Sequence, residues 1–187
     1  MWLARYAIEV PDQSSRATTF ADLAVPLFDQ LYNFAHWLTQ DRSEAEDLVQ
    51  ETYTKALRGF GGFQIGTNFR AWMFRILRNA FLTSRTGLKA SSGEEELDAV
   101  PSVDPSPEDV LIQEVEREMV RQAMTELPVA SREILLLCEV EEMKYEEIAQ
   151  VLGVPIGTVM SRLYRARQTL RNRVSEKFKG KAAWPVS

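Results

Sequence analysis

The stretch of sequence that decides the fold is YEEIAQVLGVPIGTVMSRLYRAR, residues 145–167. It predicts one helix, a tight turn at Gly153 and a second helix. Apolar residues recur along the second helix at spacings of three or four, so they form an inner stripe. That stripe consists of Val159, Leu163, Ala166 and Leu170. Two helices joined in this way form a helix-turn-helix, whose second helix can enter the major groove of DNA.

The outward face of the second helix is polar and basic. Short polar side chains and arginines are the groups that contact base edges and phosphates. The residues expected on this DNA-contacting face are Thr158, Met160, Ser161, Arg162, Tyr164, Arg165 and Gln168. An ordinary helical hairpin with a solvated basic face would give the same pattern, so this segment alone leaves both interpretations open.

The charge is unevenly distributed along a chain whose formal net charge is −5. No acidic residue occurs in residues 59–93, where Lys and Arg are frequent. Ten acidic residues follow within residues 94–118, and residues 158–181 are again basic. A basic block can bind phosphate locally even in an acidic chain. We expect the acidic block, which joins two basic ones, to fold back over either of them.

Composition excludes several classes of protein. The chain has 187 residues, 45% of them hydrophobic, enough for one or two small domains with real cores. No apolar run approaches the length of a membrane-spanning helix, so no membrane insertion is expected. The single cysteine, Cys138, excludes an intrachain disulfide and fits a cytoplasmic protein; after three leucines it is expected to be buried and inert. With His36 as the one histidine, the sequence predicts no metal, no cofactor and no catalytic residue.

Helical periodicity runs through nearly the whole chain, and no segment alternates with period two for long enough to form a sheet. Serine, glycine and proline gather in the acidic block, as in a flexible linker. The predicted fold is therefore all-α, with two small helical domains. We expect an N-terminal tail over 1–18, a first domain over 19–88, an acidic linker over 89–111, a second domain over 112–178 and a C-terminal tail over 179–187.

Two helices are expected in the first domain. Ser43 and Glu46 fit a capping box that starts one of them, and the other runs from Asn68 to Arg85. The loop between them, residues 59–67, is rich in glycine and phenylalanine but lacks the ending of a phosphate-binding loop. Beside a face of arginine and asparagine, such a loop suits an unstacked base. A tight helical corner whose aromatic rings belong to the core explains the loop equally well.

Several separate sequence motifs, taken in their order along the chain, extend over most of its length. They are DLVQET from Asp47, GTNFRAWMFRILRN from Gly66, LP at Leu127, YEEIA from Tyr145 and GTVMSR from Gly157. Together they resemble the extracytoplasmic-function (ECF) sigma factors, small two-domain bacterial transcription initiation factors, and most of all their oxidative-stress branch. The resemblance covers residues from about 20 to 178 and implies an alternative sigma factor with a region 2 helical bundle and a region 4 helix-turn-helix domain.

In this family, region 2 docks on the clamp helices of the β′ subunit of core RNA polymerase. The resemblance carries that role to the helix with the DLVQET motif, whose outer face would otherwise be interpreted as a solvated surface. The polymerase-binding residues implied are Asp47, Leu48, Gln50, Glu51 and Arg58.

Region 2 of the family also melts the minus-ten promoter element and captures a flipped base of the non-template strand. The residues implied for this element are Phe60, Phe63, Asn68, Arg75, Arg78 and Asn79, with Asn79 as a reader and the arginines on the backbone. Region 4 would read the minus-thirty-five element through the outward residues of the second helix. Met160 stands where some relatives carry a basic residue, so their promoter sequence does not transfer to this chain.

The partners implied are core RNA polymerase, through its β′ clamp helices and β flap, promoter DNA and an anti-sigma factor; no small-molecule substrate is expected. In the oxidative-stress branch the anti-sigma protein contains zinc and a thiol switch. The alternative is a helix-turn-helix transcriptional regulator with an N-terminal effector or dimerisation domain, which gives no reason for the acid-free block. An enzyme such as a nuclease is disfavoured, because the acidic residues gather in a linker.

Overall fold

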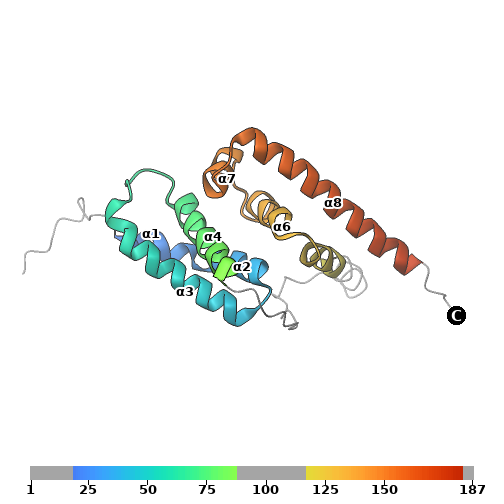
Figure 1. The fold of residues 1–187 in the computed structure, drawn as a ribbon, viewed down its shortest axis with the longest axis horizontal. Helices are drawn as coiled ribbons and strands as arrows, with labels where there is room; N and C mark the ends of the chain where they lie inside the picture. Colours follow the sequence, from blue (N-terminus) through green and yellow to red (C-terminus); the bar gives the residue numbers. More distant parts are fainter. Residues whose placement is uncertain (1–18, 88–116, 183–187) are drawn as a thin grey trace, which may run out of the picture.

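The computed structural model describes residues 19–87 and 117–182, and all regular structure in these ranges is helical (Figure 1). No strand occurs within them, so the predicted all-α class is confirmed. The predicted N-terminal tail and acidic linker lie outside the described residues, and so does the expected folding back of that linker over the basic blocks.

Four α-helices form what we call the N-terminal bundle: α1 (Phe20–Ala24), α2 (Phe28–Thr39), α3 (Arg42–Gly59) and α4 (Phe69–Gly87). The predicted capping box at Ser43 and Glu46 is wrong. Asp41 caps α3, because its carboxylate accepts a hydrogen bond from the backbone N–H of Glu44 at 2.7 Å, and aspartate is among the best residues for this position. Asn68 caps α4 in the same way, so the predicted start of that helix is confirmed.

The C-terminal bundle consists of a helix over residues 117–125, α6 (Val129–Leu135) with a following π-helical turn (Leu136–Val140), α7 (Tyr145–Leu152) and α8 (Ile156–Ala182). Gly153 ends α7 in the left-handed conformation, with φ of 65°, as the predicted turn requires. Val159, Leu163 and Ala166 are buried, and Leu170 is partly buried, so the inner stripe is confirmed. Helix α8 continues to Ala182, past the predicted domain boundary at 178.

The two bundles pack against each other around a continuous apolar core. Helix α4 lies against α7, and α2 lies against α6, as the adjacent ribbons in Figure 1 show. Phe34 of α2 and Phe74 of α4 are fully buried with ring centroids 5.1 Å apart, and Leu135 of α6 is buried in the same cluster. The two predicted domains are therefore in a closed arrangement in this structure.

Arg132, in the first half of α6, joins the two bundles although it is only 4% exposed. Its guanidinium donates hydrogen bonds to the carbonyl oxygens of Met124 at 3.0 Å, Thr125 at 2.6 Å and Leu127 at 3.0 Å, around the end of the helix over 117–125. It also donates to the carbonyl oxygen of Trp37, near the end of α2, at 2.8 Å. The last carbonyls of a helix lack partners in their own helix and carry partial negative charge, so they can hold a buried cation without a carboxylate.

We expect Arg132→Met to lower the free energy of unfolding by about 3 kcal/mol, because several buried carbonyl oxygens lose their donor. Urea unfolding followed by circular dichroism measures the change. Arg171→Met, at an exposed position of α8, is the control and should stay within about 0.5 kcal/mol of the parent. A loss below about 1 kcal/mol for Arg132→Met would contradict the bridging role.

Candidate nucleic-acid interface

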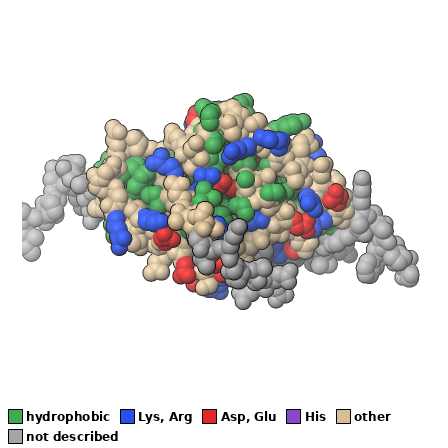
Figure 2. Space-filling model, viewed as in Figure 1, with side chains coloured by type: hydrophobic (Ala, Val, Ile, Leu, Met, Phe, Trp, Pro, Cys, Tyr) green, Lys and Arg blue, Asp and Glu red, His purple; other side chains and the backbone are tan. Residues whose placement is uncertain are grey.

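The seven residues predicted to contact duplex DNA lie along one side of α8, and all are at least partly exposed. Met160 is 55% exposed and Tyr164 is 66% exposed, although both are apolar or aromatic. Ser161 and Arg165 are also exposed, and the space-filling view in Figure 2 shows Lys and Arg side chains spread among apolar ones over the molecule. This side of α8 is thus open to a duplex.

Arg167 forms an ion pair with Glu139, with 2.7 Å between the guanidinium and the carboxylate. The same guanidinium donates a hydrogen bond to the sulfur of Cys138 at 3.6 Å. Burial raises the pKa of the Cys138 thiol, and the charge of Glu139 adds to the rise. Cys138 is half-buried rather than fully buried as predicted, but its raised pKa disfavours the reactive thiolate.

The outer face of α3 carries most of the predicted polymerase-binding residues. Asp47, Gln50, Glu51 and Arg58 are exposed. Leu48 is 5% exposed and packs in the core on the inner side of the helix, and its role in polymerase binding stays a prediction.

Sequence reasoning missed one residue on the same face of α3. Leu57 is 61% exposed and lies seven positions after Gln50, about two helical turns on, so the two share a face. Its exposure is the signal, because an apolar side chain in solvent beside charged ones often marks a contact surface.

The residues predicted for the minus-ten element divide into three sets. Arg75 and Asn79 are exposed one turn apart on α4. Asn68 and Arg78 are partly buried against the C-terminal bundle. Phe60 and Phe63 form the third set.

Phe60 and Phe63 stack on each other, with ring centroids 6.1 Å apart and planes inclined by 12°. Phe63 also packs against Phe69 at 5.2 Å and Trp72 at 5.0 Å, so both rings are partly buried in an aromatic cluster of the N-terminal bundle. This favours the alternative of a helical corner, and their role beside a flipped base stays a prediction.

Three side chains of α4 and its cap contact carboxylates of the C-terminal bundle. Arg78 binds Glu133 of α6 at 2.6 Å, and Arg70 binds Glu141 at 2.5 Å. The third contact is a hydrogen bond of 2.5 Å from the Asn68 amide to Glu147 of α7. The two bundles therefore meet through polar contacts as well as through the apolar core.

Burial raises the pKa of Glu133 above its usual range, and the positive charges of Arg78 and Arg162 offset only part of this rise. Burial likewise raises the pKa of Glu141 against the opposing effect of Arg70. A carboxyl group with a raised folded-state pKa contributes most to stability at low pH. That contribution is lost as the pH rises through the folded-state pKa.

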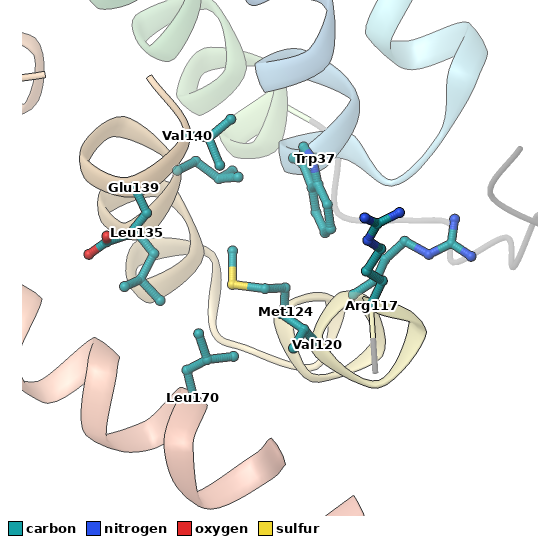
Figure 3. Close-up of a pocket in the computed structure, with 10 residues that line it drawn as sticks. Trp37, Arg117, Val120, Met124, Leu135, Glu139, Val140 and Leu170 are labelled. Atoms are coloured by element: carbon teal, nitrogen blue, oxygen red, sulfur yellow. The ribbon is translucent and has the colours of Figure 1, made fainter. Parts of the chain in front are cut away.

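An apolar groove of about 550 Å³ lies between the bundles (Figure 3). Trp37 of α2 forms one side, and Met124 and Leu135 of the C-terminal bundle point towards the same space. Leu170 of α8 and Arg117 lie at its border. Any molecule that fills this groove contacts both bundles at once.

No helix within residues 19–87 and 117–182 is both long and apolar enough to cross a membrane. The same described residues contain no group of three or more His, Cys, Asp or Glu side chains placed to hold a metal ion.

We expect Glu133→Gln, which is neutral at every pH, to unfold at a temperature about 2–4 °C above the parent near neutral pH. The difference should shrink as the pH falls, because the parent carboxyl then takes up the proton that its buried position favours. Thermal unfolding at several pH values measures this. Glu146→Gln, at an exposed position of α7, is the control and should not show the trend. A lower midpoint for Glu133→Gln at neutral pH would mean that the ion pair outweighs desolvation.

Comparison with known proteins adds independent evidence. The chain matches the sigma-70 region 2 family model over residues 26–90 and the sigma-70 region 4 model over residues 117–170. It is 37% identical over 147 residues to the ECF RNA polymerase sigma factor SigE of Mycolicibacterium smegmatis, which covers 77% of this chain but 57% of that relative. The chain therefore spans little more than half the length of SigE.

Other relatives match over most of both chains. The ECF RNA polymerase sigma factor EcfG of Rhodopseudomonas palustris is 35% identical over 147 residues, covering 79% of this chain and 78% of EcfG. The sigma factor RpoE of Bartonella quintana, solved with the anti-sigma factor NepR, superposes with a TM-score of 0.64 at 28% identity, covering 81% and 93% of the two chains. On these matches, the chain belongs to the extracytoplasmic-function family of RNA polymerase sigma factors.

Proposed function

We propose that this chain is an alternative sigma factor that binds core RNA polymerase and directs promoter recognition and DNA melting. The observation that carries the proposal is the presence, in one chain, of region 2 and region 4 helices with separate polar faces on α3, α4 and α8. It is an initiation factor rather than an enzyme, and it acts in the cytoplasm with the polymerase. The match of residues 26–90 to region 2 removes the alternative of a regulator with an unrelated N-terminal domain.

In this proposal α8 enters the major groove of the minus-thirty-five element. Arg165 is exposed and available to phosphates, while Met160 offers a thioether that packs on a thymine methyl but cannot bond guanine. Arg75 and Asn79 of α4 are exposed, and in this proposal they contact the separated strand of the minus-ten element. Of these side chains, Met160 and Asn79 would contact bases, whereas Arg165 and Arg75 would contact the backbone, which carries no sequence information.

An anti-sigma factor is the proposed regulator, by extension from the complex of RpoE with NepR. The apolar groove with Trp37 on one side and Leu135 on the other suits an apolar side chain of a partner helix. Because the groove needs both bundles in place, a partner that fills it binds the closed arrangement and stabilises it. The oxidative-stress branch, with its zinc-containing regulator, stays a prediction.

The test of the function is reconstitution with core RNA polymerase, followed by run-off transcription from a genomic promoter library. We expect the chain to direct transcripts from a defined subset of promoters. Binding to duplex DNA without polymerase binding or transcripts would overturn the proposal.

We expect the double variant Asp47→Lys, Glu51→Lys to bind core polymerase at least about tenfold more weakly, because both carboxylates of the α3 face are reversed. A pull-down with core polymerase measures the affinity, and unchanged circular dichroism shows that the bundle still folds. Glu142→Lys, Glu146→Lys, at exposed positions of the C-terminal bundle, is the matched control for net charge. Equal affinity for the Asp47, Glu51 variant and the parent would exclude this face from the interface.

A second variant tests the α8 face. Arg165→Ala should weaken binding to duplex minus-thirty-five DNA and reduce the slope of log K against log salt by about 0.9, because one phosphate contact is lost. Fluorescence anisotropy over a salt series gives the slope. Arg167→Ala, whose parent side chain is held by Glu139, should leave the slope unchanged. The assignment of α8 would be contradicted by identical slopes for Arg165→Ala and the parent.

A further inference from the structure

The walls of the apolar groove between the bundles are held in place by hydrogen bonds. Trp37 and Met124 form two of these walls (Figure 3). Arg132 donates to the backbone carbonyl oxygens of both residues, at 2.8 Å and 3.0 Å, and so ties the walls together. The side-chain amide of Gln40 adds a hydrogen bond of 2.9 Å to the carbonyl oxygen of Thr125. The groove is therefore preformed, as small-molecule sites usually are.

The lining of the groove is mostly apolar. Leu135 and Leu136 are only 2% and 1% exposed, so they form its floor. Val120 and Val140 are 42% and 59% exposed and form its edges. A ligand that covers this surface removes apolar area from water, which favours binding. The volume of about 550 Å³ lies within the range of small-molecule sites, about 300–1,000 Å³.

The shape of the ligand follows from this volume. An α-helix with its side chains is about 10–12 Å across, so it can place only side chains in the groove. A single alkyl chain is slender enough to lie in the groove along its whole length. The apolar floor offers no polar partner to a ligand, so polar groups belong at an end of the ligand.

Charge around the groove is distributed unevenly. Arg117 lies beside Trp37, whereas Glu139 lies on the other side of the groove (Figure 3). Arg121 also lines the groove one helical turn after Arg117, and it forms an ion pair with Glu118. Arginine binds carboxylates strongly because its planar donors match their two oxygens. A ligand with one anionic end therefore fits with that end beside Arg117 and away from Glu139.

We propose that this groove binds a long-chain carboxylate, with the alkyl chain over Leu135 and Leu136 and the carboxylate beside Arg117. The inference goes beyond the proposed sigma-factor function and does not depend on it. Because the ligand contacts both bundles at once, it stabilises the arrangement in which they are packed together.

The first test uses the full-length parent protein and three amphiphiles at concentrations below those at which they form micelles. Isothermal titration calorimetry should show saturable binding of dodecanoate, with one ligand per protein. Octanoate should bind at least about tenfold more weakly, because each methylene that stays in water is lost to binding. Without saturable binding of dodecanoate, the proposal is wrong.

The third amphiphile, dodecyltrimethylammonium, has the alkyl chain length of the first and a cationic head group. It should bind at least about tenfold more weakly than dodecanoate, because it cannot pair with Arg117. The net charge of −5 attracts cations in general, so a preference for the anion reports the local arginines. Equal affinities for the two head groups would overturn the proposal.

A pair of variants locates the site. Val120→Asp with Val140→Asp changes only exposed edge residues and should bind dodecanoate at least about tenfold more weakly, because charged groups then border the alkyl chain. Val25→Asp with Val129→Asp is the matched control, since it makes the same change in net charge at exposed valines that do not line the groove. The control should bind like the parent. Equal affinities for the edge variant and the control would place the ligand elsewhere.

A charge reversal tests the head-group position. Arg117→Glu should bind dodecanoate at least about fivefold more weakly, whereas Arg171→Glu, at an exposed position of α8, should bind it like the parent. The preference for dodecanoate over dodecyltrimethylammonium should also shrink in Arg117→Glu. An unchanged preference would contradict the assignment of the carboxylate to Arg117.

Sedimentation with phosphatidylglycerol vesicles distinguishes a free carboxylate from the acyl chains of a membrane. We expect the protein to stay in the supernatant. Sedimentation that the Val120→Asp, Val140→Asp variant abolishes would assign the groove to a membrane and overturn the proposal. None of these measurements uses polymerase, so run-off transcription by the parent tests the sigma-factor function separately.

Discussion

A guanidinium cannot leave water unless acceptors meet it, and this constraint governs how the two bundles of the chain come together. Three arginines lie at or near the contact between the bundles, and two kinds of acceptor bind them. Carbonyl oxygens at helix ends receive Arg132, whereas carboxylates receive Arg70 and Arg78. Within the described part of the chain, no buried side-chain nitrogen or oxygen lacks a hydrogen-bond partner.

These two solutions have different consequences. The carbonyl oxygens around Arg132 come from both bundles, so this contact holds the two bundles together without a carboxylate. The contacts of Arg70 and Arg78 occupy groups that a polyanion also binds. The apolar core supplies most of the driving force for the packing of the two bundles. The polar contacts determine which side chains this packing covers.

The parts of the fold that follow local rules could be predicted from the sequence. The burial of Val159 and Leu163 follows from the helical period of the apolar residues. The left-handed turn between the two helices follows from the glycine at position 153. An error arose where two candidates compete locally: Asp41 caps α3 instead of Ser43. The pairing of Arg70 with Glu141 was beyond sequence reasoning, since 71 residues separate them and no periodicity links them.

The family resemblance treated Arg75, Arg78 and Asn79 as one group, and the structure separates them for a geometric reason. Successive residues of a helix are rotated by about 100°, so Arg75 and Asn79 share a side of α4 while Arg78 turns towards α6. One helix can therefore keep Asn79 exposed while Arg78 stays bound to Glu133. In the closed arrangement the exposed side of α4 is therefore open to a ligand, whereas Arg78 is occupied by Glu133.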